Sequence, residues 1–212
     1  MRRNELQRSA RAAYERLPYR AVALLLPFLV LAVHISVMAL TLPQPEFAAM
    51  LGLMTAYMLP PAGKETVIPL GIALGIPWWY MALSIVMIDV ETGLFMALNF
   101  DVAYRIPYLG PLLADLTKKT KEFLDAHRWL AGLWVFAIIL MVSVPFFGSG
   151  GIRGSIAGKL LGMSTLLTFL AILTGALIGC FAMALGSDVL LTHICTNGLL
   201  PADIAGMVCS GG

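Results

Sequence analysis

The sequence contains few charged residues and few cysteines. Only 12% of its 212 residues are Asp, Glu, Lys or Arg, whereas 59% are hydrophobic, and a soluble domain carries about twice that charged share. No Lys or Arg follows Lys159. This composition excludes a soluble domain, and we expect no nucleic-acid partner. It predicts an integral membrane protein formed by one helical bundle.

The three cysteines and three histidines form no motif for metal binding or catalysis. Neither a CxxC pair nor zinc-ligand spacing occurs, and the sequence has no HExxH motif. We therefore expect no metal site, no cofactor and no enzymatic activity. Cys180 lies in an apolar stretch where a small buried side chain fits. Cys195 and Cys209 could form a disulfide if the C-terminal tail faces an oxidising compartment.

Three apolar stretches are long enough to cross a membrane, namely residues 21–42, 78–99 and 164–185. A basic amphipathic arm, residues 1–20, precedes the first, and its six Arg predict a position at the anionic cytoplasmic face. The first stretch lacks a small-x-small cleavage site, so we expect it to remain in the protein. The tail, residues 187–212, should then lie on the extracytoplasmic side.

Two further apolar regions, residues 46–75 and 129–163, are each interrupted by proline and glycine. In the first, two prolines and a glycine precede Lys64 and Glu65, and in the second the interruption covers residues 145–151. Each arm has about 12 to 14 residues, or roughly 20 Å of helix, which is shorter than the roughly 30 Å hydrocarbon core of a bilayer. The pattern therefore predicts two re-entrant helical hairpins.

The basic residues and the glycines predict the topology. If the N-terminal arm is cytoplasmic, a hairpin at residues 46–75 leaves the connector at residues 100–128, with five Lys and Arg, on the same side, as the positive-inside rule requires.

Three glycines recur 87 positions later: Gly63, Gly71 and Gly75 match Gly150, Gly158 and Gly162. This spacing predicts an inverted repeat.

The predicted fold is therefore an all-α integral membrane domain covering residues 21–186. It combines three full transmembrane helices with two re-entrant hairpins in an inverted repeat. We expect the protein in the inner cell membrane with its N-terminus in the cytoplasm. Three spans and two hairpins leave little shielding from lipid, so a homodimer is an open alternative to a monomer.

Apart from Glu46 at the very start of residues 46–75, six charged residues fall inside the apolar regions, where each charge is costly unless it is paired or hydrated. They are Lys64, Glu65, Asp89, Glu91, Arg153 and Lys159. In one interpretation they pair with one another and only hold the bundle together. In the other they form a site between the two hairpin tips, in which six residues bind substrate: Lys64, Glu65, Gly148, Gly150, Arg153 and Lys159.

A proton or a cation would be carried at this site by Glu65, Asp89 or Glu91. Residues two apart point to different sides of a helix, so at most one of Asp89 and Glu91 can share a lining face with a given partner. His34, near the middle of the first span, is either a member of a proton relay or a side chain bonded by a neighbouring helix.

Two blocks at the predicted tips resemble a known family. Residues 67–75, VIPLGIALG, are similar to the AIPLGIALG block of the small multi-drug export family, and residues 144–150, VPFFGSG, followed by Gly154, are similar to its IPLPGTG block. More distantly, Arg153, Gly158 and Gly162 before a span resemble the DedA-like superfamily. That resemblance implies paired re-entrant hairpins and proton-dependent handling of lipid-linked phosphates.

We expect the protein to be a small secondary transporter or exporter, coupled to protons and working within membrane lipid. The alternative is a flippase or scramblase of an anionic lipid of the polyprenyl-phosphate type, whose head group Arg153 and Lys64 would hold. The substrate is thus either a small molecule or a lipid phosphate. A membrane enzyme and a non-transporting scaffold are further hypotheses, which the sequence favours less.

Overall fold

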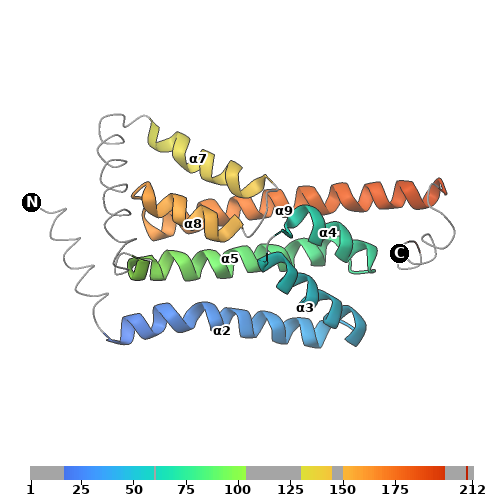
Figure 1. The fold of residues 1–212 in the computed structure, drawn as a ribbon, viewed down its shortest axis with the longest axis horizontal. Coiled ribbons are helices and arrows are strands. Elements are labelled where there is room, and N and C mark those ends of the chain that lie inside the picture. The colour runs from blue at the N-terminus through green and yellow to red at the C-terminus, as the bar shows by residue number, and fades with distance from the viewer. Residues whose placement is uncertain (1–16, 60, 104–129, 145–149, 199–208, 210–212) are drawn as a thin grey trace, which may run out of the picture.

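The computed structural model describes residues 17–59, 61–103, 130–144, 150–198 and 209, and the regular secondary structure of these residues is entirely helical. Among these described residues seven helices follow one another, and Figure 1 labels them: α2 Leu17–Thr41, α3 Gln44–Met58, α4 Lys64–Ala73, α5 Trp78–Ala103, α7 Leu130–Ser143, α8 Gly150–Leu160 and α9 Thr165–Thr196. Most of the basic arm, the charged connector and Gly148 lie outside the described residues, so the predictions for them stay predictions.

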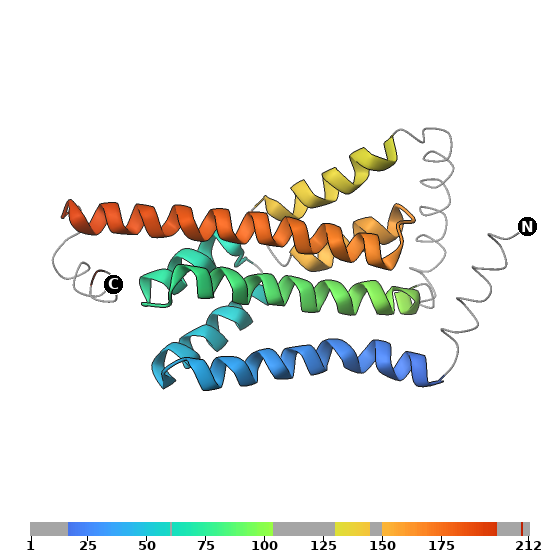
Figure 2. The same cartoon turned by 180° about the vertical axis from the view of Figure 1, so that it is seen from behind.

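The three predicted transmembrane stretches are confirmed as long apolar helices. Three helices contain an apolar part that is long enough to cross a membrane. These parts are Arg20–Thr41 of α2, Trp78–Phe100 of α5 and Thr165–Thr196 of α9. Helices α5 and α9 pack side by side and run in opposite directions, and α2 covers the other side of α5 (Figures 1 and 2). Helix α5 is the most deeply buried of the three, so charged groups on it are surrounded by protein.

Helices α3 and α4 are separated at the predicted proline and glycine break. After α3 ends, Leu59 adopts an extended conformation with φ −106° and ψ 128°, and Gly63 then caps α4. The hydroxyl of Thr66 accepts a hydrogen bond from the Gly63 amide at 3.1 Å and donates one to the Gly63 carbonyl at 3.0 Å. Local hydrogen bonds thus start α4 in a new direction.

The helices α3, α4, α7 and α8 are each too short to cross a bilayer alone. At 1.5 Å per residue they are about 15 to 22 Å long, against a hydrocarbon core of about 30 Å. In Figure 1, α4 and α8 both begin near the middle of the molecule and run to opposite ends. This arrangement suits two hairpins entering from opposite sides, although their placement in a membrane stays a prediction.

The ends of α4 and α8 have the same local structure at the predicted 87-residue spacing. Gly75 and Gly162 both have positive φ angles, 88° and 70°, which side-chain-bearing residues rarely adopt. The residue after each glycine donates to a carbonyl five positions back: Ile76 to Gly71 at 3.1 Å and Met163 to Gly158 at 2.9 Å. The match is local, and the inverted repeat as a whole stays a prediction.

Glycines on α9 allow α7 to approach it closely. A Cβ atom added at Gly175 would lie 2.6 Å from the Ile139 carbonyl oxygen, and one at Gly179 would lie 2.4 Å from that of Ser143. Together with the buried Ala171, these glycines form a face of small residues at spacings of four, which is typical of closely packed membrane helices.

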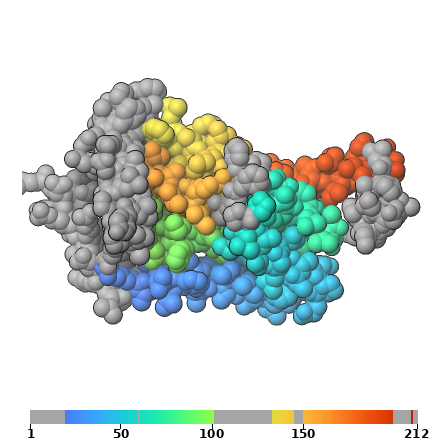
Figure 3. All heavy atoms as spheres, in the orientation of Figure 1, coloured from blue at the N-terminus to red at the C-terminus, as the bar shows by residue number. Residues whose placement is uncertain are grey.

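Helix α9 continues to Thr196, beyond the predicted end of the span at residue 185. The polar residues that favoured an end there are accommodated in the helix, since Ser187 donates its hydroxyl hydrogen to the Met183 carbonyl at 2.8 Å. At 32 residues, α9 is about 48 Å long. Figure 3 shows its C-terminal part projecting beyond the other helices. A disulfide joins Cys195, in the last turn of α9, to Cys209.

Candidate functional site

Helix α5 presents Asp89 and Glu91 to opposite sides of the molecule. Successive residues turn by about 100° around a helix, so residues two apart are separated by about 200°. Asp89 is completely buried and faces α4 and α8, whereas Glu91 faces α2. The prediction that the two carboxylates serve different faces is confirmed.

Asp89 and Lys64 form a buried ion pair where the ends of several helices meet. The Lys64 Nζ lies 2.8 Å from Asp89 Oδ2, and the two side chains are 2% and 0% exposed. Asp89 Oδ1 accepts a hydrogen bond from the Tyr57 hydroxyl at 2.8 Å and one from the Gly151 amide at 3.1 Å. The carboxylate therefore also caps the positive N-terminal end of α8.

Two further bonds complete this arrangement. The Gly150 amide donates to the Tyr57 hydroxyl at 3.3 Å, and Lys64 also donates to the Val142 carbonyl oxygen at 2.9 Å. We call Tyr57, Lys64, Asp89, Gly150 and Gly151 the Lys64–Asp89 network. It joins α3, α4, α5 and α8, and through Val142 it also holds the end of α7.

Gly151 allows α8 to approach α5 closely in this network. A Cβ atom at this position would lie 2.0 Å from the Asp89 carbonyl oxygen and 2.7 Å from Thr92 Oγ1. Any other residue would push the start of α8 away from Asp89.

The other predicted site residues lie at different places. Glu65 is in the first turn of α4, partly buried, and its Oε2 has no hydrogen-bond partner among the described residues. Arg153 follows Gly150 by one turn of α8. Lys159 lies at the far end of α8, roughly 13 Å along the helix axis from Gly150, and donates to Thr165 Oγ1 at 2.5 Å. The structure thus brings together Lys64, Asp89 and Gly150, and separates Lys159 and Glu91 from them.

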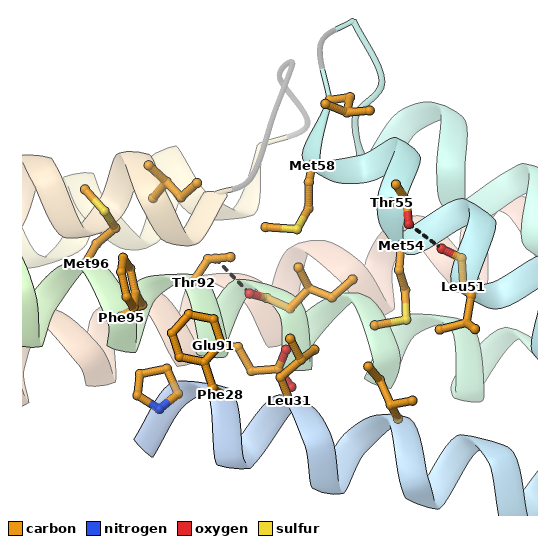
Figure 4. Close-up of a pocket in the computed structure, with 15 residues that line it drawn as sticks. Phe28, Leu31, Leu51, Met54, Thr55, Met58, Glu91, Thr92, Phe95 and Met96 are labelled. Carbon is orange, nitrogen blue, oxygen red and sulfur yellow. Dashed lines mark hydrogen bonds between the residues drawn. The ribbon is translucent and has the colours of Figure 1, made fainter. Parts of the chain in front are cut away.

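A cavity of about 580 Å³ lies between α2, α3 and α5. Figure 4 shows its wall, in which side chains of α2 and α3 face those of α5. Its lining residues are Pro27, Phe28, Leu31, Ile35, Leu51, Met54, Thr55, Met58, Leu59, Ile88, Glu91, Thr92, Phe95, Met96 and Ile152. Glu91 is the one ionisable residue among them. Pockets of this volume hold drug-sized molecules.

Glu91 is held at the cavity wall by one neighbour on α2. His34 Nδ1 lies 3.0 Å from Glu91 Oε1, and the two side chains are 8% and 6% exposed. The two threonines of the wall donate within their own helices, Thr55 to Leu51 at 2.8 Å and Thr92 to Ile88 at 2.7 Å. The cavity therefore offers one carboxylate in otherwise apolar surroundings, and His34 has the neighbouring-helix partner that one interpretation of the sequence predicts.

The cavity and the role of Tyr57 could not be predicted from the sequence with a clear pattern. The residues contributed by α2 and α5 recur at spacings of three and four, as expected for one face of a helix. However, these helices are apolar on every side, so the pattern does not distinguish a cavity wall from a lipid-facing surface. Tyr57 lies in an apolar run in which no neighbouring residue indicates a polar partner.

A comparison with known protein families covers three of the four helices of the network, α4, α5 and α8, and one side of the cavity. A family model described as "Putative small multi-drug export protein" matches residues 64–182, which is more than half of the chain. The chain belongs to the small multi-drug export protein family. No curated protein and no solved structure matches it. The matched region begins at Lys64, so α2 and α3, which form the opposite wall of the cavity, precede it.

Proposed function

We propose that this family member exports lipophilic organic cations in exchange for protons, and that Glu91 is the group to which both bind. The observation that carries the proposal is a single carboxylate in the wall of an apolar cavity of about 580 Å³. The apolar wall suits the hydrophobic part of a substrate, and the carboxylate suits a positive charge that has lost its water.

The exchange follows from the cost of an unpaired buried charge. The structure pairs His34 with Glu91 at 3.0 Å. A cation that enters neutralises the carboxylate directly, and a proton does the same when the cation leaves. Because one carboxylate holds one or the other, proton uptake favours release of the cation, and cation binding favours release of the proton.

The membrane arrangement is part of the proposal. The short helix pairs α3–α4 and α7–α8 act as re-entrant hairpins of an inverted repeat, which supports alternating access from the two membrane sides. The disulfide between Cys195 and Cys209 supports an extracytoplasmic C-terminus, because disulfides persist in oxidising compartments. Three spans then put the N-terminus in the cytoplasm.

The geometry favours a cation over the anionic lipid head group of the alternative function. Lys64, which that alternative assigns to the head group, is paired with Asp89 at 2.8 Å. The amides of Gly150 and Gly151 at the start of α8 are bonded to Tyr57 and Asp89. In this arrangement, an anion would have to displace Asp89 from Lys64 and from α8.

Transport in liposomes tests the proposal. The full-length protein is reconstituted, a pH gradient is imposed, and movement of tetraphenylphosphonium is followed with an ion-selective electrode. We expect gradient-driven exchange in the wild type and at least about a 100-fold loss in E91Q, because the amide cannot alternate between proton and cation. The matched control is E46Q, which removes a carboxylate from α3 outside the cavity and should exchange normally.

Two results would contradict the proposal. Movement that ignores the pH gradient would remove proton coupling, and wild-type exchange in E91Q would remove the site. The variant R153A separates the alternative function. If R153A abolished activity while E91Q retained it, handling of an anionic lipid would explain the data better.

A further inference from the structure

We infer that the Lys64–Asp89 network is the barrier that closes the inner end of the cavity, and that the ion pair separates each time a substrate crosses. This inference rests on the proposed exchange at Glu91. It assigns a function to the Lys64–Asp89 network, which the proposed exchange at Glu91 does not explain.

The Lys64–Asp89 network lies next to the wall of the cavity. Three residues of the cavity wall, Met58, Ile88 and Ile152, are direct sequence neighbours of the network residues Tyr57, Asp89 and Gly151. The network thus lies immediately behind the wall, where α3, α5 and α8 converge. A substrate that moves inward from the cavity meets it first.

The opposite side of the network is formed by α9. Cys180 on α9 is completely buried and interacts electrostatically with both Lys64 and Asp89. The residues that line the cavity come from α2, α3, α5 and α8. On this inference, a molecule in the cavity reaches Cys180 only after passing the ion pair.

The energetics favour a contact that opens and closes. A buried ion pair adds little stability compared with two well-packed apolar side chains, so a purely structural role gains little from charges here. When the barrier opens and water enters, however, Lys64 and Asp89 are hydrated again, whereas an apolar plug would expose apolar surface to water. The charged pair therefore closes firmly and opens at a lower cost.

The position of the pair in the chain agrees with this role. Lys64 is the first residue of α4, and the amide groups that bond Asp89 and Tyr57 are the first of α8. Movement of either short helix along its axis would break these bonds without disturbing the contact between α5 and α9. The network thus joins the parts of the fold that can move with the part that stays fixed.

Alkylation of Cys180 tests the barrier directly. Of the three cysteines, Cys195 and Cys209 form the disulfide and Cys180 is free and buried, so the full-length protein carries one free thiol. In liposomes, N-ethylmaleimide should modify Cys180 at least about 10-fold faster during tetraphenylphosphonium exchange than at rest. The variant C180S reports background labelling. An unchanged rate during exchange would overturn the inference.

Two variants of the pair should give opposite results. D89N leaves Lys64 without its counter-charge, so labelling of Cys180 at rest should rise about 10-fold. The double variant K64M with D89L replaces the pair by apolar side chains. It should bind tetraphenylphosphonium within about 2-fold of wild type, yet lose at least about 10-fold in both exchange and labelling, because the barrier stays closed. D188N is the control, because it removes an acidic side chain of α9 that is not part of the Lys64–Asp89 network.

The outcomes separate this inference from the proposed function. If tetraphenylphosphonium binds in a Glu91-dependent way but the double variant exchanges at the wild-type rate, the barrier is wrong and the exporter stands. If the wild type does not bind tetraphenylphosphonium, the exporter is wrong. In that case, the rate at which N-ethylmaleimide modifies Cys180 in D89N, measured without substrate, still shows whether the network blocks access to Cys180. Circular dichroism and gel filtration verify that each variant is folded.

Discussion

Two carboxylates in the middle of α5, Asp89 and Glu91, lie two residues apart and have opposite surroundings. Asp89 is completely buried and bonded by Lys64, Tyr57 and Gly151, each from a different helix. Glu91 faces a cavity and is paired with His34. The difference shows that a carboxylate in an apolar helix can be satisfied entirely by protein or left with room for a ligand, and that helical rotation alone separates the two roles.

The largest difference between the two carboxylates should appear in stability. D89N should lower the free energy of unfolding by about 3–5 kcal/mol, because it leaves the charge of Lys64 buried without its partner. E91Q should lower it by less than about 1 kcal/mol, since the amide oxygen can still accept a bond from His34. Chemical unfolding in detergent micelles measures both. Equal effects would mean that Glu91 is as much a structural residue as Asp89.

The close packing behind Asp89 gives the next largest effect. G151A should cost about 1–3 kcal/mol, because the added methyl group would meet the Asp89 carbonyl oxygen at 2.0 Å and force α8 to move. The control is G186A on α9, where nothing lies within 4 Å of the added atom. It should be neutral or stabilising by up to about 1 kcal/mol. Thermal unfolding compares the pair, and a neutral G151A would contradict the described approach of α8 to α5.

Much of the fold could be predicted from local sequence. Long apolar runs define the spans, and adjacent prolines with Gly63 end α3 and start α4 because proline cannot continue the helical hydrogen bonding. The end of α9 was predicted too early. Gly186 and its polar neighbours usually favour a helix end, but Ser187 bonds back to Met183 within the helix and the chain continues.

The site was predictable only in part. The charges in apolar regions were recognised as exceptional, and the opposite directions of Asp89 and Glu91 follow from helical geometry alone. Which charge meets which could not be predicted, because the pairing of Lys64 with Asp89 depends on how two helices fold against one another. The cavity depends on three helices at once, and no single helix contains a pattern that reveals it.

A larger side chain in the cavity should weaken substrate binding near Glu91 and leave the surroundings of Asp89 unchanged. L31W places a larger side chain in the cavity wall and should weaken tetraphenylphosphonium binding about 10-fold, or about 1.4 kcal/mol, by occupying its space. L24W lies on the same helix outside the cavity lining, at 47% exposure, and should bind normally. Equilibrium binding to the purified protein compares them. Equal affinities would place the substrate outside this cavity.

An effect of similar size is expected on the Asp89 side. Y57F removes the hydroxyl that donates to Asp89 and accepts from Gly150, and it should cost about 1–2 kcal/mol of stability. The matched change Y80F removes an exposed hydroxyl that bonds Thr41 and should cost less than about 0.5 kcal/mol. Thermal unfolding of both variants tests the difference. Equal losses would show that the Lys64–Asp89 network does not depend on Tyr57.

Proton release on cation binding tests the central claim most directly. Tetraphenylphosphonium is added to the purified full-length protein in weakly buffered, mildly acidic solution, and the released protons are counted with a pH indicator. The exchange at Glu91 predicts release of about one proton per cation bound in the wild type, and neither binding nor release in E91Q. Cation binding without proton release, or unchanged release in E91Q, would contradict it.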